Sequence, residues 1–490
     1  MPRLLDRMSP PSNHQSRPTI FHFPASQPTM TEINKHQAHT STATWLGVIP
    51  RDISRYSWLI LLNTWLSWAM NALTFAMIYV LGTVIISDFQ LSPMNWGLIV
   101  SGYLAVRVLC DIPVSIISDR IGRGWRRKLV WFPMMMLYAV AGTLIAIPSL
   151  SGTVTGFCLL LIGIALGTTA SEALGVVSAS EWWPREHCGF AIGVHHTGYP
   201  IGALMGGGIA AATLSVFGED GWRMVYLTSI LTMPFAIWYW FLATQAHQEA
   251  VEQHDREVGL TPSVEIHDDD DRVSLRSCFE AAKNREVLIF GICALLFQAM
   301  QNVFQTSYPE YLKFVGGLGA ASVAGLTVVW SITGAFFQFL WPTISDRIGR
   351  KWFIVGAGVI QALVFVLLPY CTTVPAAIGI QLLYGVTLNA VFPLLFASTA
   401  DIAGKRIASA LGVVFSLLWL GAVLGTLFAS VILQSGGGFT NASAYRLVYF
   451  LMPALCTVII VLRLLVRETN PPQRPHRVGG GTAGDLNAPM

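Results

Sequence analysis

Charged side chains are scarce in this chain of 490 residues. Asp, Glu, Lys and Arg together make up 12% of it, whereas soluble globular proteins carry about a quarter. Hydrophobic residues make up 53%, more apolar surface than one core can enclose, so the composition excludes a soluble protein and indicates a lipid environment. The net charge is only +3, and the basic residues form no patch of the kind that binds nucleic acid.

Metal and enzyme signatures are also missing. The 7 cysteines are scattered, mostly within apolar segments, without CxxC or Cys/His spacing, so we interpret them as small buried hydrophobic residues rather than disulfides or metal ligands. The chain contains no GxSxG, HExxH or Walker-type loop. We therefore expect neither an enzyme nor a cofactor.

What the chain does have is long apolar runs. About 20 mostly apolar residues are needed for a helix to cross the hydrocarbon core of a bilayer. Twelve runs meet this requirement and predict an all-α polytopic membrane protein with 12 transmembrane helices. They cover residues 57–82, 94–117, 129–148, 153–180, 189–216, 223–244, 287–307, 320–345, 352–370, 374–400, 407–433 and 445–467.

A polar stretch with the acidic run Asp268–Asp271 divides the twelve runs into two sets of six. No membrane span would tolerate such a stretch, so we interpret it as a cytoplasmic linker. Both ends of the chain are rich in Pro and small polar residues, a composition typical of disorder. The predicted organisation is a disordered tail (1–55), a six-helix bundle (56–245), the linker (246–286), a second six-helix bundle (287–468) and a second disordered tail (469–490).

Basic residues are distributed unequally between the two sides of the predicted spans. One side's short connections hold only Arg223, Lys313 and Arg446, whereas most other Lys and Arg residues fall on the opposite side. The positive-inside bias predicts that the side rich in basic residues, with both termini, faces the cytoplasm. We expect a multi-pass protein of the plasma (inner) membrane.

The two sets of spans share a repeated sequence. Residues 118–123 read SDRIGR, and residues 345–350 repeat the same six letters 227 positions later, each time after the second span of a half. Trp125 and Trp352 are separated by the same 227 positions. Two homologous halves with a binding site at their junction are the plan of many secondary transporters.

The SDRIGR segments resemble the signature loop of the major facilitator superfamily, roughly G-x-x-x-D-R-x-G-R-R/K. The resemblance covers about residues 56–468, with Ser115 and Pro342 at the opening glycine positions. The segment Glu181-Trp-Trp-Pro184 is similar to the E-x-x-P-x-x-x-R-G element of carriers in this family, although Cys188 stands where the family has Arg.

This resemblance implies a major facilitator fold with a cytoplasmic gate. We expect Asp119 to accept hydrogen bonds at a helix N-terminus of the other half, and Arg123 with the 126–128 cluster to pair with Glu181; Arg185 is an alternative partner. The other reading is that these arginines only orient the chain. The predicted gate residues are Asp119, Arg120, Gly122, Arg123, Glu181, Arg185, Asp346, Arg347, Gly349 and Arg350.

Polar residues within spans are costly and indicate function. Arg107 and Asp111 share one helical face; Arg107 is the candidate anion-binding cation, or the two residues neutralise one another. Glu172 has no cation near it in sequence and, with the adjacent His195 and His196, is a candidate for proton coupling; each histidine is equally well explained as a packed residue. The second half offers only amides. The site candidates are Asn71, Arg107, Asp111, Glu172, His196, Gln298, Gln301, Asn302, Gln338 and Asn389.

Together these features predict a secondary transporter that imports a small organic anion, such as a carboxylate or a sugar acid, with a proton by alternating access. The expected partners are the substrate, a proton and the lipid bilayer, and we expect a functional monomer. Drug efflux by proton exchange is one alternative. A non-transporting receptor is another, although the linker and tails are short for an ordered receptor domain.

Overall fold

The computed structural model describes residues 44–45, 49–263, 275–403 and 407–469. It divides into two compact units, Met1–Asp52 and Ile53–Met490. In the first unit the short strands β1 (Thr44–Trp45) and β2 (Ile49–Pro50) pair antiparallel. The rest of the predicted tails, 1–55 and 469–490, lies almost entirely outside the described residues.

The second unit is helical. Within the described ranges, 12 helices are long and apolar enough to cross a membrane, which confirms the predicted all-α fold of two six-helix halves. The first half contains α2 (Arg55–Phe75) with α3 (Met77–Val80), α5 (Pro93–Ile121), α6 (Lys128–Ile145), α8 (Val154–Glu181), α9 (Cys188–His196) with α10 (Gly198–Phe217), and η3 (Glu219–Leu231) with α11 (Thr232–Leu242). The second contains α14 (Arg285–Glu310), α15 (Ala320–Leu326) with α16 (Trp330–Ile348), α17 (Lys351–Leu367), α18 (Val374–Leu388) with α19 (Val391–Ala403), α20 (Ile407–Ser435) and α21 (Ala442–Leu465).

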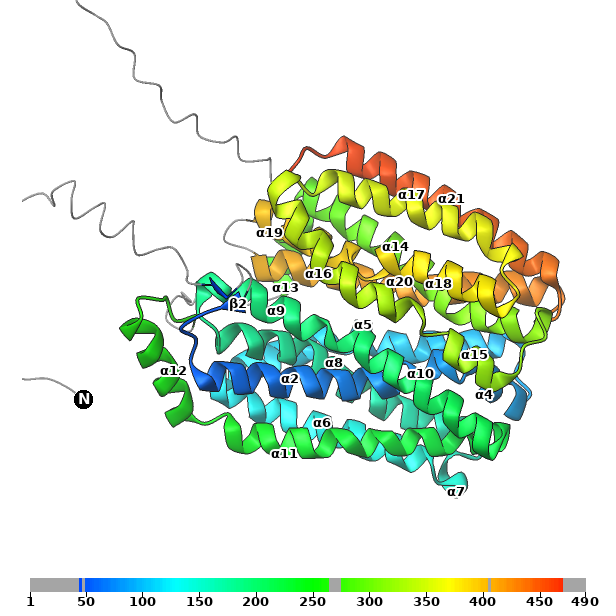
Figure 1. The fold of residues 1–490 in the computed structure, drawn as a ribbon, viewed down its shortest axis with the longest axis horizontal. Helices are drawn as coiled ribbons and strands as arrows, with labels where there is room; N and C mark the ends of the chain where they lie inside the picture. Colours follow the sequence, from blue (N-terminus) through cyan, green and yellow to red (C-terminus); the bar gives the residue numbers. More distant parts are fainter. Residues whose placement is uncertain (1–43, 46–48, 264–274, 404–406, 470–490) are drawn as a thin grey trace, which may run out of the picture. The chain divides into compact units, whose positions relative to one another are not determined.

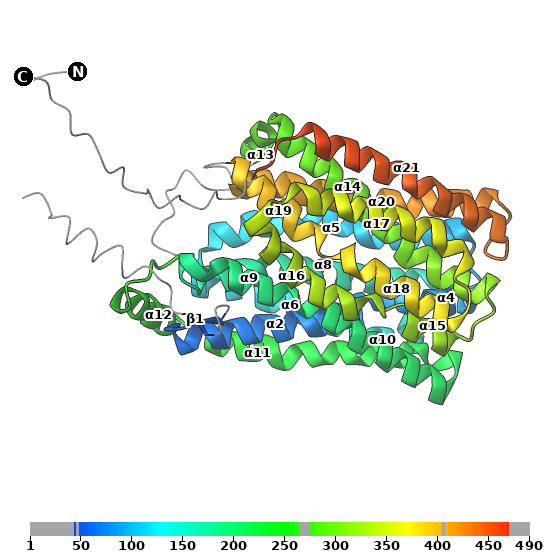
Figure 2. The same ribbon diagram turned by 45° about the horizontal axis from the view of Figure 1, so that its top comes forward.

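The two halves lie side by side, with α2, α6 and α11 on one side and α14, α17 and α21 on the other (Figures 1 and 2). The seam between them is formed by α5 against α20 and by α10 against α15 and α16. Short elements join the spans, among them α4 (Gly82–Asp88), α7 (Pro148–Ser151) and η5 (Tyr311–Val315). Residues 118–128 form what we call the first loop, and residues 345–351 form the second. Both lie at the same end of the helices, which we call the loop end.

Side-chain caps start several spans where the sequence offers them. The hydroxyl of Ser92 accepts a hydrogen bond from the Asn95 backbone at the start of α5, with Pro93 in the first turn. Thr153 caps α8 in the same way. These caps satisfy backbone N–H groups that a helix start leaves without partners.

Glycines bring the inner helices of each half into backbone contact. A Cβ atom at Gly202 of α10 would lie 2.0 Å from the carbonyl oxygen of Ala69 in α2, and one at Gly421 of α20 would lie 2.1 Å from that of Leu295 in α14. The two contacts occupy matching places in the two halves. Such small-residue positions let transmembrane helices approach closely.

Several spans are interrupted along their length, and three of these breaks concern the region around the seam. The first span breaks at Ala76, the fifth at Thr197, and the tenth between α18 and α19, after Asn389. At the second break the Thr197 hydroxyl donates to the carbonyl of Val194 and accepts from the Trp65 indole. Discontinuous helices of this kind mark binding regions in transporters, because they free backbone polar groups inside the bundle.

The predicted linker contains two helices that we did not expect, α12 (Gln245–Glu257) and α13 (Leu275–Ala282). The acidic run Asp268–Asp271 lies outside the described residues. The helix α12 packs on the first half, where the His247 ring stacks on Tyr56 with centroids 4.2 Å apart.

The halves meet at the end opposite the loops. There Gln434 of α20 accepts a hydrogen bond from the Met94 backbone of α5 at 3.3 Å. Lys313 of η5 pairs with Glu219 of η3 at 2.7 Å. Nearer the middle, the Ser101 hydroxyl donates to the Val423 carbonyl at 3.4 Å. These contacts run from the centre of the seam to the end opposite the loops.

Candidate functional site

A buried ion pair lies at the centre of the first half. Arg107 of α5 donates from Nη2 to the carboxylate of Glu172 in α8. Arg107 is only 1% exposed, and its Nε and Nη1 atoms have no hydrogen-bond partner among the described residues. A buried guanidinium with free N–H groups is costly unless something accepts from them, so the arrangement is suited to a second anion beside Glu172.

Aromatic rings cover this pair from both halves. The guanidinium carbon of Arg107 lies 3.8 Å from the ring centroid of Trp419, which belongs to α20 of the second half, and 5.5 Å from that of Phe75. Tyr199 of α10 stacks between Trp68 and Trp330, with centroids about 6 Å apart in both contacts. The rings form an apolar wall around Arg107. Because this wall excludes water, it strengthens the electrostatic interactions of the guanidinium group.

Asp111 does not provide the counterion of Arg107. In place of the mutual neutralisation that their spacing suggested, the direct partner of Arg107 is Glu172, and Asp111 contributes a nearby charge. Glu172 has no cation near it in sequence, as expected, and its partner comes from another span. Asp111 lies one helical turn away, with its Oδ1 atom unpartnered among the described residues.

The two histidines have different surroundings. His195 is completely buried against Gly175 and Trp68, with neither ring nitrogen hydrogen-bonded among the described residues. His196, whose ring centroid is 5.9 Å from that of His195, lies on the side of Glu172. The structure therefore brings His196, rather than His195, to the Arg107–Glu172 pair.

The amides of the second half come from α14, from α16 and from the helix break after α18. Asn302 of α14 accepts a hydrogen bond from Tyr79 of the first half at 3.0 Å, so it lies on the seam. Its own amide donates to the Gln298 carbonyl, and Gln301 is 5% exposed on the same helix. Asn389 lies at the helix break after α18, and Gln338 is partly buried in α16.

Asn71 is completely buried in α2. Its backbone carbonyl accepts a hydrogen bond from Tyr138 of α6 at 2.6 Å, and both polar atoms of its side chain lack a hydrogen-bond partner among the described residues. This backbone hydrogen bond is therefore inside the first half, whereas the side-chain hydrogen bond of Asn302 crosses the seam.

The first loop is held by a second buried ion pair. Arg127 donates to Glu181 at 2.6 and 2.7 Å, to Asp119 at 2.9 Å and to the Ser118 hydroxyl at 2.9 Å. Glu181 also accepts from the backbone N–H of Gly124 at 2.8 Å. The expected pairing of Glu181 with the 126–128 cluster is thus present, and Arg127 is the member that forms it.

Other expected gate contacts are different in the structure. The ion pair of Asp119 lies within its own half, with Arg127, rather than at a helix terminus of the other half. Arg185 donates its backbone N–H to Thr261 and does not replace Arg127 on Glu181 within the described residues. Arg120 is exposed. Gly122 adopts a φ of +132°, which favours glycine and lets the chain turn after α5.

The second loop repeats this plan with different residues. Arg350 pairs with Asp401 of α19, and Glu468 accepts from the backbone N–H groups of Arg350 and Lys351 at 3.1 and 2.8 Å. Gly349, with φ +99°, lies directly under Glu468. The side chains of Asp346 and Arg347, two predicted gate residues, lie outside the described residues.

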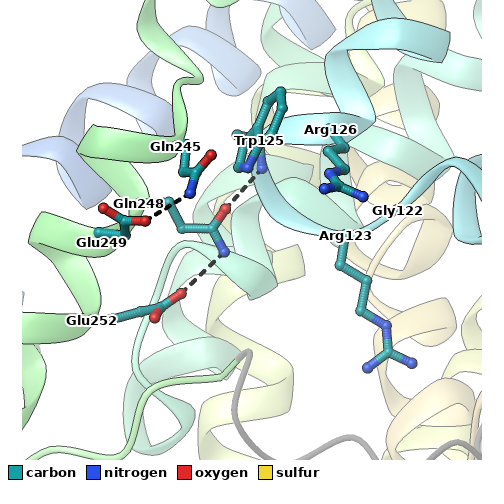
Figure 3. A pocket seen from close by; sticks show the side chains of 8 residues that line it. All are labelled: Gly122, Arg123, Trp125, Arg126, Gln245, Gln248, Glu249 and Glu252. Atoms are coloured by element: carbon teal, nitrogen blue, oxygen red, sulfur yellow. Dashed lines mark hydrogen bonds between the residues drawn. The ribbon is translucent and has the colours of Figure 1, made fainter.

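A pocket of about 310 Å³ lies between the first loop and α12 (Figure 3). At its centre Gln248 accepts from the Trp125 backbone at 2.9 Å and donates to Glu252 at 3.2 Å. Arg123 extends away from this cluster in Figure 3. Gln248 has the same role in the first loop as Glu468 in the second: each side chain accepts from backbone N–H groups of its loop.

Sequence reasoning missed several residues of the site. Trp419, Tyr199 and Tyr79 are aromatic residues in apolar spans, and nothing in their local sequence separates them from core residues. It also missed an acid in the second half. We predicted a span ending at residue 307 and only amides within it, but α14 and η5 continue to Val315, and Glu310 is buried at 3% exposure.

The chain matches known proteins over most of its length. The profile of the Major Facilitator Superfamily matches residues 64–328 and 290–486. A Haemophilus influenzae protein named as a metabolite transport protein is 25% identical, over 61% of this chain and 70% of that protein. The D-xylose-proton symporter-like 3 of Arabidopsis thaliana is 26% identical over 55% of this chain, which spans about half (53%) of that relative. The probable L-galactonate transporter of Escherichia coli is 24% identical over 72% of this chain and 77% of that protein.

Solved structures show the same fold. A bacterial homologue of the human lysosomal transporter Spinster superposes with a TM-score of 0.63 at 16% identity, covering 84% of this chain and 96% of that structure. The xylose transporter XylE from E. coli gives 0.63 at 17% identity, covering 85% and 99%. With twelve apolar helices, a duplicated signature loop and a matching profile over most of its length, this integral, multi-pass membrane protein is a secondary transporter and not an enzyme, and it belongs to the major facilitator superfamily.

Proposed function

We propose that this transporter carries a small organic anion, a carboxylate or a sugar acid, inward together with a proton. The observation that carries the proposal is the environment of Arg107, which is 1% exposed, pairs with Glu172 and has Asp111 one helical turn away. Its Nε and Nη1 atoms have no hydrogen-bond partner among the described residues. Guanidinium groups bind carboxylates with charge-assisted hydrogen bonds. One of the matched relatives is named as a probable L-galactonate transporter, which supports a sugar acid. Another is named as a D-xylose-proton symporter-like protein, which supports proton coupling but with a neutral sugar.

Coupling follows from competition for Arg107. While Glu172 is ionised, it occupies Nη2 of Arg107 and repels a second carboxylate. A proton on Glu172 removes this charge, so the substrate anion becomes the better partner. His196 lies beside Glu172 and supplies a further proton-accepting group. Gln298, Gln301, Asn302, Gln338 and Asn389 offer hydrogen bonds to substrate hydroxyl groups from the second half, and Asn71 and Asp111 from the first.

The two loops are the proposed gate. With both termini in the cytoplasm, as the basic residues predict, the loops face the cytoplasm and the halves meet at the outer end, which corresponds to an inward-facing state. Movement of the halves against each other would bring the loops together and separate the Lys313–Glu219 contact. We propose a functional monomer in the plasma (inner) membrane.

The test is uptake into proteoliposomes of labelled monocarboxylates, sugar acids and neutral sugars, with and without an inward proton gradient. We expect the gradient to drive accumulation of one of the acids. Arg107→Lys is the matched variant, because it keeps the charge but loses the planar fork; both it and Arg107→Ala should lose uptake. Wild-type rates in Arg107→Ala would refute the anion site. Gradient-driven extrusion of a hydrophobic cation would instead favour drug efflux, which the aromatic wall around Arg107 also permits.

A further inference from the structure

A carboxylate that the proposed transport cycle does not use lies at the end opposite the loops. Glu310, at the end of α14, is 3% exposed within the span Arg285–Val315. The indole of Trp96 from α5 lies close to it, with the indole nitrogen unpartnered among the described residues, so part of its cover comes from the other half of the protein. The Trp96 ring in turn rests on Gly82 of α4, where a Cβ atom would lie 2.9 Å away.

The groups around Glu310 provide no countercharge. Trp96 faces it from α5, and Tyr445 and Tyr449 face it from α21. Three cations lie at this end: Lys313 pairs with Glu219 and Arg223 with Asp88, and Arg446 is exposed. Among the described residues no Lys, Arg or His forms an ion pair with Glu310.

A carboxylate buried in a membrane protein without a cation is far more costly than a carboxylic acid. Trp96 belongs to the closed seam: at the neighbouring Gly97, a Cβ atom would lie 2.0 Å from the Ser430 hydroxyl of α20. Separation of the halves would therefore draw Trp96 away from Glu310 and admit water to the carboxyl group.

We propose that Glu310 is a proton-binding site separate from Arg107 and Glu172, protonated while this end is closed and exposed to solvent when the end opens. Closure of this end then favours proton binding, and proton binding favours closure, because a neutral acid avoids the cost of a buried charge. The role in transport rests on the proposed function, whereas the proton-linked closure does not.

The test measures closure directly, without substrate. Spin labels at Val216 of α10 and Tyr370, which are 73% and 69% exposed, report the separation of the two halves at this end by pulsed electron resonance. In the wild type we expect the population with long distances to grow as the pH rises from about 5 to about 8.5. Glu310→Gln, which imitates the protonated acid, should keep short distances throughout.

Asp220→Asn is the matched control, since Asp220 is an exposed acid at the same end that forms no ion pair among the described residues; it should retain the pH response. Distances in the wild type that do not change with pH would overturn the proposal, and so would a Glu310→Gln variant that responds like the wild type. If the Gln variant does not fold, Glu310→Asp provides the test. The pH midpoint of its distance change should differ from that of the wild type, and an unchanged midpoint counts against the site. If closure depends on Glu310 as proposed but no acid is transported, only the proposed function fails.

Discussion

The ring of Trp419 and the guanidinium of Arg107 are in contact across the seam, with the guanidinium carbon 3.8 Å from the ring centroid. The ring comes from α20 and the cation from α5, so the contact exists only while these two helices are together. It links the candidate anion site of one half to the position of the other.

Replacement of Trp419 tests this link. A desolvated cation–π contact contributes about 2 kcal/mol, and about 1.4 kcal/mol corresponds to a tenfold change in an equilibrium constant. Trp419→Leu should therefore weaken binding of the transported acid by more than tenfold, whereas Trp419→Phe should retain most of it. Isothermal titration in detergent measures both affinities. Equal affinities in the two variants would show that the ring acts only as a spacer.

Glycine positions at the inner helices should not tolerate a methyl group. At Gly202 a Cβ atom would overlap the Ala69 carbonyl at 2.0 Å, and overpacking of this kind costs about 1–3 kcal/mol. Gly202→Ala should lower the melting temperature of the purified protein. Gly208→Ala on the same helix is the control, because a Cβ atom there meets nothing within 4 Å. A melting temperature equally low in both variants would contradict the packing argument.

The Arg127–Glu181 pair should be important for stability. Glu181→Ala leaves the buried Arg127 with Asp119 as its remaining ion-pair partner, so the loss should be smaller than that of a fully broken buried pair, which is about 3–5 kcal/mol. We expect a markedly lower melting temperature, and Glu181→Asp should restore part of the loss. Glu249→Ala, an exposed acid of α12, serves as the control and should behave as the wild type does.

Asp255 of α12 should make the stability of the linker helix depend on pH. Burial, with Glu186 and Glu252 nearby and His254 opposing them, raises the pKa of Asp255 from 3.8 to about 6. An acid whose pKa is higher in the folded state binds more protons when folded, so stability falls as the pH rises from about 4 to about 6 and is lowest above that range. Asp255→Asn should raise the melting temperature at about pH 7.5 and have little effect at about pH 4. Glu257→Gln, exposed on the same helix, should show no such difference.

Accessibility labelling checks the predicted orientation. Cysteines at Arg120 and at Arg467, which is 84% exposed in its side chain, should react with a membrane-impermeant reagent only from the cytoplasmic side. A cysteine at Asp220 should react only from outside. Labelling of Arg120 and Arg467 from opposite sides would be incompatible with two parallel halves. The native cysteines must first be replaced, since four of the 7 are partly exposed.

The fold was largely predictable because its main determinant, the length of apolar runs, is local. The expected run at 94–117 corresponds to the helix Pro93–Ile121, and that at 374–400 to the span Val374–Ala403. Prediction failed where a contact joins distant spans. Nothing near Glu172 in the sequence points to Arg107, which lies 65 residues away. The seventh span extends past its expected end at residue 307, and packing against the other helices keeps Pro309 and Glu310 in α14.

The two copies of the signature loop are no longer equivalent. In the first, the carboxylate of Glu181 and the amide of Gln248 each accept one backbone N–H group of the loop. In the second, the carboxylate of Glu468 accepts two, and Arg463 lies 3.9 Å from it. The first copy is therefore fastened to the end of the fourth span and to α12, and the second to a residue that follows the twelfth span. Movement of α12 would release the first loop without disturbing its twin, although both were inherited from a single ancestor.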